Sequence, residues 1–148
     1  GSELPGLQRR SLASEPLVLA MPDGHPLAGR ARPGLRAVVK EPLVMFPEGT
    51  RQSGPKIHPL FDGAAYLSIK SGMPIVPVGF GGTEGVMPKG SKKILPKKCS
   101  VVVGKPIFPP QSETGRLPRT ATTDLTAALS QALQIVFDQA KQKAGQTS

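Results

Sequence analysis

The clearest pattern of hydrophobic and polar positions lies near the C-terminal end of the chain, between residues 122 and 145. Apolar side chains recur there with the three-to-four-residue spacing that places them on one face of an α-helix. That face consists of Leu125, Leu129, Ala132, Leu133, Val136 and Ala140. Thr122 or Thr123 can cap the start of the helix, and Gly145 follows its end. The sequence therefore predicts a long amphipathic helix that packs on a core.

Upstream of this helix, short apolar runs alternate with turn-rich stretches. The runs predict strands at residues 16–22, 42–46, 73–80 and 99–107. The run at 42–46 is continuously apolar, as in a strand buried on both faces, and Pro77 predicts an edge position or a bulge. A helix is predicted from Asp62 to the closing Gly72, and one or two helical turns at 35–41. This order predicts an α/β fold with a mixed, partly parallel sheet and flanking helices.

Length, charge and cysteine content limit the number of domains, the kind of partner and the compartment. The 148 residues suffice for one domain, and we expect a flexible segment at 1–15, a single α/β domain at 16–145 and a tail at 146–148. The formal net charge of +9 favours an anionic partner such as a lipid surface, a phosphorylated ligand or nucleic acid. The alternative explanation of this charge is that it only keeps the protein soluble. One cysteine, Cys99, excludes an intramolecular disulfide and suits a reducing cytoplasm.

Two stretches, in a fixed order, resemble a known family. Residues 46–51 read Phe-Pro-Glu-Gly-Thr-Arg, and residues 72–80 contain a Val-Pro-Val strand. They are similar to consecutive blocks of the 1-acylglycerol-3-phosphate (lysophosphatidate) acyltransferase family, and every position of the first block matches. The resemblance covers about residues 41–145, which corresponds to the downstream half of the enzyme. It implies an α/β fold that is incomplete relative to the full acyltransferase.

The resemblance assigns the first block to the glycerophosphate of the acceptor, and the residue types suit that role. Arg51 can bind a phosphate through two parallel, charge-assisted hydrogen bonds. Gly49 allows the backbone to approach a ligand, and Thr50 can donate a hydrogen bond. Glu48 can accept from a glycerol hydroxyl or hold Arg51 in place. The alternative is a surface turn with a local ion pair.

The catalytic block of the same family, a His, four intervening residues and an Asp, is not found in this sequence. His25 is followed five positions later by Arg30, and His58 by Gly63. His58 and Asp62 are four positions apart, but His58 precedes a proline and is biased towards extended backbone, so the two are not expected on one helix face. No catalytic residue is therefore assigned, and we expect this chain alone to be inactive.

The upstream part of the chain carries a different resemblance. Residues 15–30 contain a His-Pro-Leu-Ala turn and are similar to a strand-and-loop stretch in the effector-binding domains of LysR-type transcription regulators. Three origins remain open: a chance likeness, a truncated chain, or a chimera in which a foreign segment completes half of an acyltransferase fold.

Lysines gather in the loop that follows the Val-Pro-Val strand. They are Lys89, Lys92, Lys93, Lys97 and Lys98. In an enzyme that handles lysophosphatidate they would contact anionic lipid or the phosphates of coenzyme A, and a solvated charged face is the alternative. Nucleic acid is not expected, because aromatic stacking residues and a reader motif are lacking. Cys99 has no nearby His or Cys in the sequence, so no metal site is indicated.

Two functions follow from these observations. In the first, the chain is the glycerophosphate-binding half of a phospholipid-biosynthetic acyltransferase, with acyl-CoA or acyl carrier protein as co-substrate and no other cofactor. Such a protein is expected in the cytoplasm, peripheral on the inner face of the membrane. In the second, it is a non-catalytic hybrid or structural module that self-associates through an open sheet edge.

Overall fold

The computed structural model describes residues 20–31, 33–38, 40–49, 54–88, 93–111, 118 and 120–146. Its elements, in chain order, are α1 (Leu35–Val38), α2 (Gly63–Ser71), β1 (Val78–Gly81), α3 (Thr83–Val86), β2 (Ser100–Val103) and α4 (Ala121–Lys143). The chain divides after Gly34 into two compact units. Whether residues 16–145 form one domain stays a prediction.

The described part of the first unit consists of turns. The backbone N–H of His25 donates to the carbonyl of Pro22 at 2.9 Å, and the N–H of Ala28 donates to the carbonyl of His25 at 2.8 Å. Leu27 is the buried side chain of this segment. A strand was predicted at 16–22, but residues 20–22 are not in a strand and residues 16–19 lie outside the described part.

The sheet of the second unit is a pair of antiparallel strands, β1 and β2, with Val78 opposite Val103 and Gly81 opposite Ser100. An isolated bridge between Ile75 and Ile107 continues the pairing. On the β1 strand, two residues (76 and 77) lie between the bridge and β1. On the β2 strand, three residues (104–106) lie between β2 and the bridge. The extra residue is a β-bulge opposite Pro77, which confirms the predicted irregularity there.

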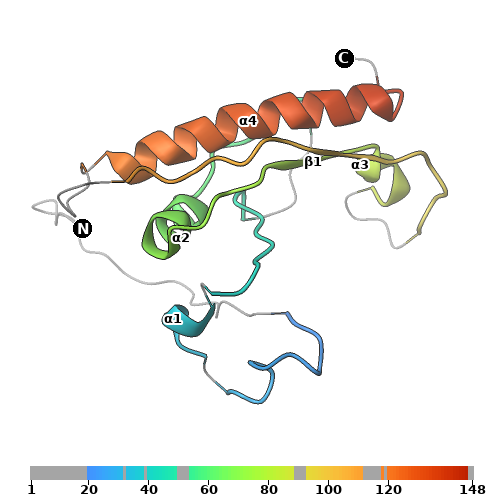
Figure 1. Cartoon of the computed structure of the whole chain (residues 1–148). Helices are drawn as coiled ribbons and strands as arrows, with labels where there is room; N and C mark the ends of the chain where they lie inside the picture. Colours follow the sequence, from blue (N-terminus) through green and yellow to red (C-terminus); the bar gives the residue numbers. More distant parts are fainter. Residues whose placement is uncertain are drawn as a thin grey trace, which may run out of the picture. The chain divides into compact units, whose positions relative to one another are not determined.

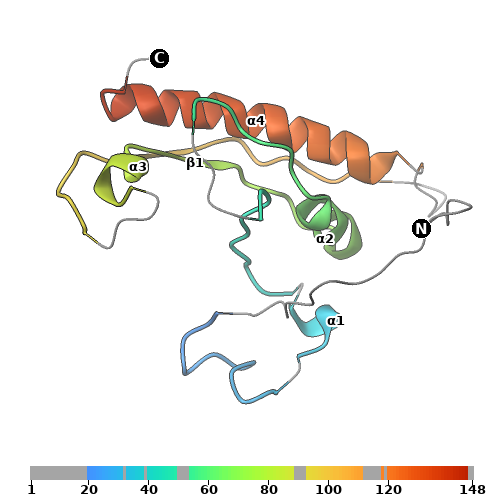
Figure 2. The same ribbon diagram turned by 180° about the vertical axis from the view of Figure 1, so that it is seen from behind.

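Helix α4 lies across one face of this strand pair, and Figures 1 and 2 show it running along β1. Glycines on β1 permit a close approach: a methyl group on Gly79 would lie 2.5 Å from the carbonyl oxygen of Val136 in α4. A methyl group on Gly81 would overlap the carbonyl of Ala140. The hydroxyl of Ser100 donates to that same carbonyl. The helix backbone therefore rests directly on β1, with no layer of side chains at these positions.

The predicted apolar face of α4 is confirmed. Leu125, Leu129, Val136 and Ala140 are buried, and Leu133 packs against the cluster that Val136 forms with β2. The start of the helix was predicted too late, because α4 begins at Ala121 rather than after Thr122 or Thr123. The N–H of Ala121 already donates to the carbonyl of Pro118 at 3.1 Å, so the first turn forms earlier along the chain.

Helix α2 ends as predicted, with Gly72 in the left-handed conformation and its N–H bound to the carbonyl of Ser68 at 2.8 Å. Asp62 holds the N-cap position, but its side chain does not cap the helix. Its carboxylate instead accepts a hydrogen bond of 2.7 Å from the hydroxyl of Thr126 in α4. Asp62 therefore links the start of α2 to α4.

The strand predicted at 42–46 is wrong. The structure assigns no strand there, and Val44 and Phe46 are 87% and 79% exposed. A continuous apolar run becomes a buried strand only where neighbouring strands and a covering layer complete its hydrogen bonds and contacts. Among the described residues this run has no strand partner. The α/β class is confirmed as a small open sheet with helices, and the pairing between its described strands is antiparallel.

Candidate functional site

The Phe-Pro-Glu-Gly part of the predicted site forms a tight turn. The N–H of Gly49 donates to the carbonyl of Phe46 at 3.0 Å, with Pro47 at the position where a turn favours proline. Gly49 has a φ of +70°, and a methyl group there would lie 2.7 Å from the ring of Phe61. The N–H of Phe61 in turn donates to the carbonyl of Pro47 at 2.9 Å. Glycine is therefore required here both by its backbone conformation and by the ring above it.

Glu48 is half-buried as a residue, and its carboxylate accepts an exposed hydrogen bond of 3.0 Å from the backbone N–H of His58. This contact joins the start of the loop to residues ten positions downstream. Thr50 and Arg51 lie outside the described residues, so the expected pairing of Glu48 with Arg51 stays a prediction. His58 precedes α2, which begins at Gly63, as the interpretation of His58 as a loop residue requires.

The other end of this loop is fixed to α4 by Gln134. The side-chain oxygen of Gln134 accepts from the N–H of Ile57 at 2.8 Å, and its amide group donates to the carbonyl of Pro55 at 3.2 Å. The ammonium of Lys141 also donates to the carbonyl of Pro55, at 3.2 Å. Residues 49–55 are thus held at both ends, by the Gly49 turn and by α4. The sequence does not point to Gln134, since nothing in a helical stripe marks a partner 77 positions away.

Gln134 also lowers the pKa of a neighbouring carboxyl group, that of Asp138. Its amide donates to both carboxylate oxygens of Asp138, at 3.0 and 3.1 Å, and Lys141 forms an ion pair with Asp138 at 3.2 Å. The hydrogen bond from Gln134 is the main reason why the pKa of Asp138 is lowered, and Lys141 adds to the effect while partial burial opposes it. One glutamine thus connects the loop to a charge pair on α4.

Replacing Gln134 with alanine should release the end of the loop at Pro55 and Ile57. We expect faster amide hydrogen exchange at Ile57 and a rise in the pKa of Asp138, because its main hydrogen-bond donor is lost. Because the pKa of Asp138 is lowered in the folded state, ionised Asp138 stabilises the protein above the ordinary carboxyl pKa, and this stabilisation is lost as the pH falls through the lowered pKa. The variant should lose the part that Gln134 contributes and keep the part due to Lys141. NMR titration and exchange measure both effects.

Gln131, an exposed glutamine on the same helix, provides the control. Gln131→Ala should leave the exchange at Ile57 and the pKa of Asp138 unchanged. Equal behaviour of the two variants would contradict the role given to Gln134.

A cavity of about 420 Å³ lies beside the anchored end of the loop. Its lining includes Pro55, Lys56, Gln134, Asp138 and Lys141. It therefore adjoins the segment that follows Arg51 in the sequence, and two of the lining groups are cationic. None of these lining residues is predicted from the sequence to be a site residue.

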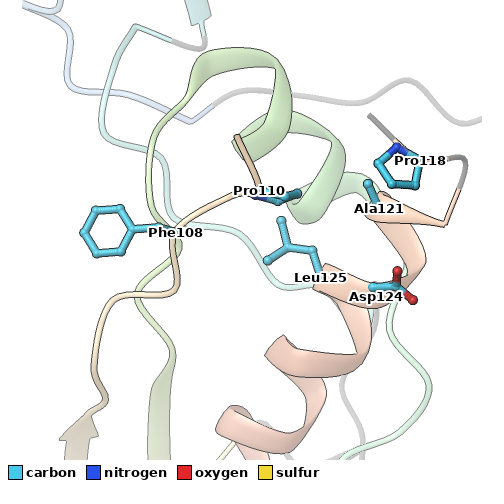
Figure 3. Close-up of a pocket in the computed structure, with 6 residues that line it drawn as sticks. All are labelled: Phe108, Pro110, Pro118, Ala121, Asp124 and Leu125. Carbon is cyan, nitrogen blue, oxygen red and sulfur yellow. The ribbon is translucent and has the colours of Figure 1, made fainter. Parts of the chain in front are cut away.

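A second cavity, of about 270 Å³, lies at the start of α4 (Figure 3). In this view Leu125 points towards Pro110, whereas the ring of Phe108 is directed away from the other labelled side chains. Asp124 is the charged residue of the lining. None of the lining residues belongs to Phe46–Arg51, so this cavity is separate in the sequence from the predicted acceptor site.

The described lysines of the predicted cluster, Lys93, Lys97 and Lys98, are exposed, and Lys89 and Lys92 lie outside the described residues. Contact with lipid or coenzyme A stays a prediction. Within the part of the chain that is described, no group of three or more His, Cys, Asp or Glu residues could hold a metal ion. None of the helices seen in that part is long and apolar enough to cross a membrane.

Comparison with known proteins gives two kinds of similarity. The sequence model of a family described as the LysR substrate binding domain matches residues 2–67. That range contains the predicted LysR-like stretch at 15–30 and also includes Phe46–Arg51.

Curated 1-acyl-sn-glycerol-3-phosphate acyltransferases give the second similarity. The chloroplast enzyme of Brassica napus is 39% identical over 67 residues, which make up 45% of this chain and 20% of that protein. The enzyme of Chlamydomonas reinhardtii is 33% identical over 89 residues, or 60% of this chain and 26% of that protein. The chain thus spans about a fifth to a quarter of the length of these relatives. The match to the Chlamydomonas enzyme is 89 residues long, which is more than the chain has after residue 67. This match therefore includes part of the range that matches the LysR model.

A solved structure shares the fold. The crystal structure of the 1-acyl-sn-glycerophosphate acyltransferase PlsC from Thermotoga maritima superposes with a TM-score of 0.57 at 24% identity, covering 82% of this chain and 47% of that one. The chain is therefore similar in sequence, over about half of its length, to 1-acyl-sn-glycerol-3-phosphate acyltransferases, and it has the fold of part of PlsC.

Proposed function

We propose that this chain is the glycerophosphate-binding half of a phospholipid-biosynthetic acyltransferase. The complete reaction would transfer an acyl group from acyl-CoA or acyl carrier protein to the free hydroxyl of lysophosphatidate. The observation that carries the proposal is the block at Phe46–Arg51, which matches the family at every position and begins in the turn closed by Gly49. The curated relatives support the same reaction class by their names.

In this proposal the loop between Gly49 and Pro55 binds the acceptor. Arg51 contacts the phosphate through its guanidinium, and Thr50 and the Gly49 backbone lie against the glycerol. Glu48 either accepts from a glycerol hydroxyl or stabilises the loop through the His58 N–H that it already binds. Gln134 of α4 holds the Pro55 end of this loop, and the turn at Gly49 holds its start.

The same chain is proposed to be catalytically inactive by itself. Acyl transfer to a hydroxyl needs a base to remove its proton, and the family's His-Asp block is not in this sequence. A cytoplasmic location, peripheral on the inner face of the membrane, is proposed because the acceptor is a membrane lipid.

Replacing Arg51 with alanine should weaken the binding of glycerol 3-phosphate and of lysophosphatidate by at least about tenfold, since charge-assisted hydrogen bonds contribute about 1.5–3 kcal/mol each. The affinity of Arg51→Lys should lie between those of the unchanged protein and Arg51→Ala, because lysine keeps the charge but loses the paired donors. Isothermal titration calorimetry measures the affinities. Arg36→Ala, at an exposed arginine of α1, is the control and should bind like the unchanged protein.

Incubation with acyl-CoA and lysophosphatidate completes this experiment, and we expect no turnover above background. Turnover that Arg51→Ala abolishes would support the binding site and contradict the proposed inactivity. Unchanged binding by Arg51→Ala would contradict the acceptor site itself.

The alternative, a self-associating module without catalytic function, is favoured by one observation on the strand pair. The face of β1 and β2 turned away from α4 carries Phe80, Val101 and Val103, which are 48%, 54% and 64% exposed. A second copy could cover these side chains or extend the open edge. Failure to bind glycerol 3-phosphate, together with an apparent mass that rises with concentration in light scattering, would support this alternative.

A further inference from the structure

The connection between β1 and β2 contains a segment, residues 93–98, whose backbone is held in place. The N–H of Leu95 donates to the carbonyl of Val86, at the end of α3, at 2.8 Å. The aliphatic stem of Lys97 lies over α3, since a methyl group on Gly85 would be 3.0 Å from its Cδ. Figures 1 and 2 show the segment beside α3, at the opposite end of β1 from α2. It is therefore a fixed surface feature of the fold.

This segment exposes two adjacent aliphatic side chains that do not contribute to a core. Ile94 is 74% exposed and Leu95 is 42% exposed. They lie between exposed lysines, with Lys93 before them and Lys97 and Lys98 after them. Ile94 and Leu95 form a hydrophobic pair between cationic side chains. Such an arrangement combines the two contributions that hold proteins on anionic bilayers, namely apolar burial and attraction to phosphates.

Downstream of Glu84, which lies on α3, the charge of the sequence has one sign only as far as residue 111. Between residues 85 and 111 there are six lysines and no Asp, Glu or Arg. A local field of that kind attracts anions, and the attraction adds over neighbouring lysines near a charged surface. Free coenzyme A could satisfy the lysines, but it offers nothing to the side chains of Ile94 and Leu95. An acyl-CoA offers them a single acyl chain, whereas a bilayer presents an apolar interior to the whole segment. A bilayer satisfies both.

We propose that residues 93–98 dock this protein on an anionic lipid bilayer, with Ile94 and Leu95 entering the interface while the flanking lysines contact lipid phosphates. The amide of Leu95 is already bound to Val86, so the backbone brings no unpaired N–H of that residue into the interface. This inference does not depend on the acceptor site, and it stands even if glycerol phosphate does not bind.

The absence of tryptophan from the sequence gives a direct test. Ile94→Trp places the single tryptophan of that variant in the segment 93–98, and Ile135→Trp places it at an exposed position of α4, where Ile135 is 58% exposed. Vesicles of phosphatidylcholine with phosphatidylglycerol should shift the emission of the first variant to shorter wavelength and leave the second unchanged. Phosphatidylcholine vesicles alone and soluble coenzyme A should shift neither.

Vesicle co-sedimentation separates the two contributions. The double replacement Ile94→Ser and Leu95→Ser should weaken binding by roughly tenfold or more, as expected for losing two partly buried aliphatic side chains. Lys97→Gln with Lys98→Gln should weaken it at low salt and have less effect at high salt. No emission shift for Ile94→Trp on anionic vesicles would overturn the proposal. So would serine variants that bind as well as the unchanged protein, because charge alone would then explain the attraction.

Discussion

Alanine at Gly81 is expected to destabilise the fold by at least about 3 kcal/mol, the upper part of the range for overpacked sites. The added methyl group would overlap the carbonyl of Ala140 and lie 2.6 Å from the N atom of Lys141, both in the backbone of α4. Ala140 and Lys141 lie in the last turn of α4, and backbone atoms cannot turn aside as a flexible side chain can, so this end of α4 would have to move away from β1. That movement would also weaken the hydrogen bond from Ser100 to the same carbonyl.

The matched control for this substitution is Gly63→Ala. Gly63 is the first residue of α2, and a methyl group there would meet only the end of the Met45 side chain, at 3.8 Å. Alanine favours helix over glycine, so this variant should be neutral or slightly stabilised. Urea unfolding followed by circular dichroism gives both free energies. A Gly81→Ala variant as stable as Gly63→Ala would contradict the direct contact between α4 and β1.

The second large effect is expected for Leu129→Ala. Leu129 is 3% exposed on the inner face of α4, and truncating a buried leucine to alanine costs about 2–5 kcal/mol through lost burial and the cavity left behind. Ile135, on the same helix, is 58% exposed, so its replacement by alanine should cost less than about 1 kcal/mol. Thermal and urea unfolding of both variants provide the comparison. Equal losses would mean that the inner face of α4 is not packed as described.

The elements that sequence predicts well here are those whose pattern is long and local. The stripe from Leu125 to Ala140 repeats over several turns, and a helix satisfies its own backbone hydrogen bonds, so α4 follows from the pattern. Residues 42–46 show the opposite case. Five apolar residues satisfy the description of a buried strand, but whether they become one depends on partners elsewhere in the chain, and Val44 remains 87% exposed.

For the candidate site, sequence predicts the residues of the turn but not what holds them. The six-residue block identifies Glu48 and Gly49, and the proline and glycine predict a tight turn. The anchors, Gln134 and Phe61, carry no comparable signal, because each acts through a contact with a distant part of the chain. Gly79 and Gly81, by contrast, do carry a signal in the sequence. Two glycines on the same side of a strand indicate that another backbone comes close.

The position of α4 in the chain has a consequence for biosynthesis. This helix supplies the inner packing for β1 and β2, the partner of Asp62 and the anchor of Pro55, yet all these segments leave the ribosome before it does. They therefore cannot reach their native contacts during translation until α4 has emerged. Until then the face of the strand pair that α4 covers stays exposed, which favours association with other nascent chains.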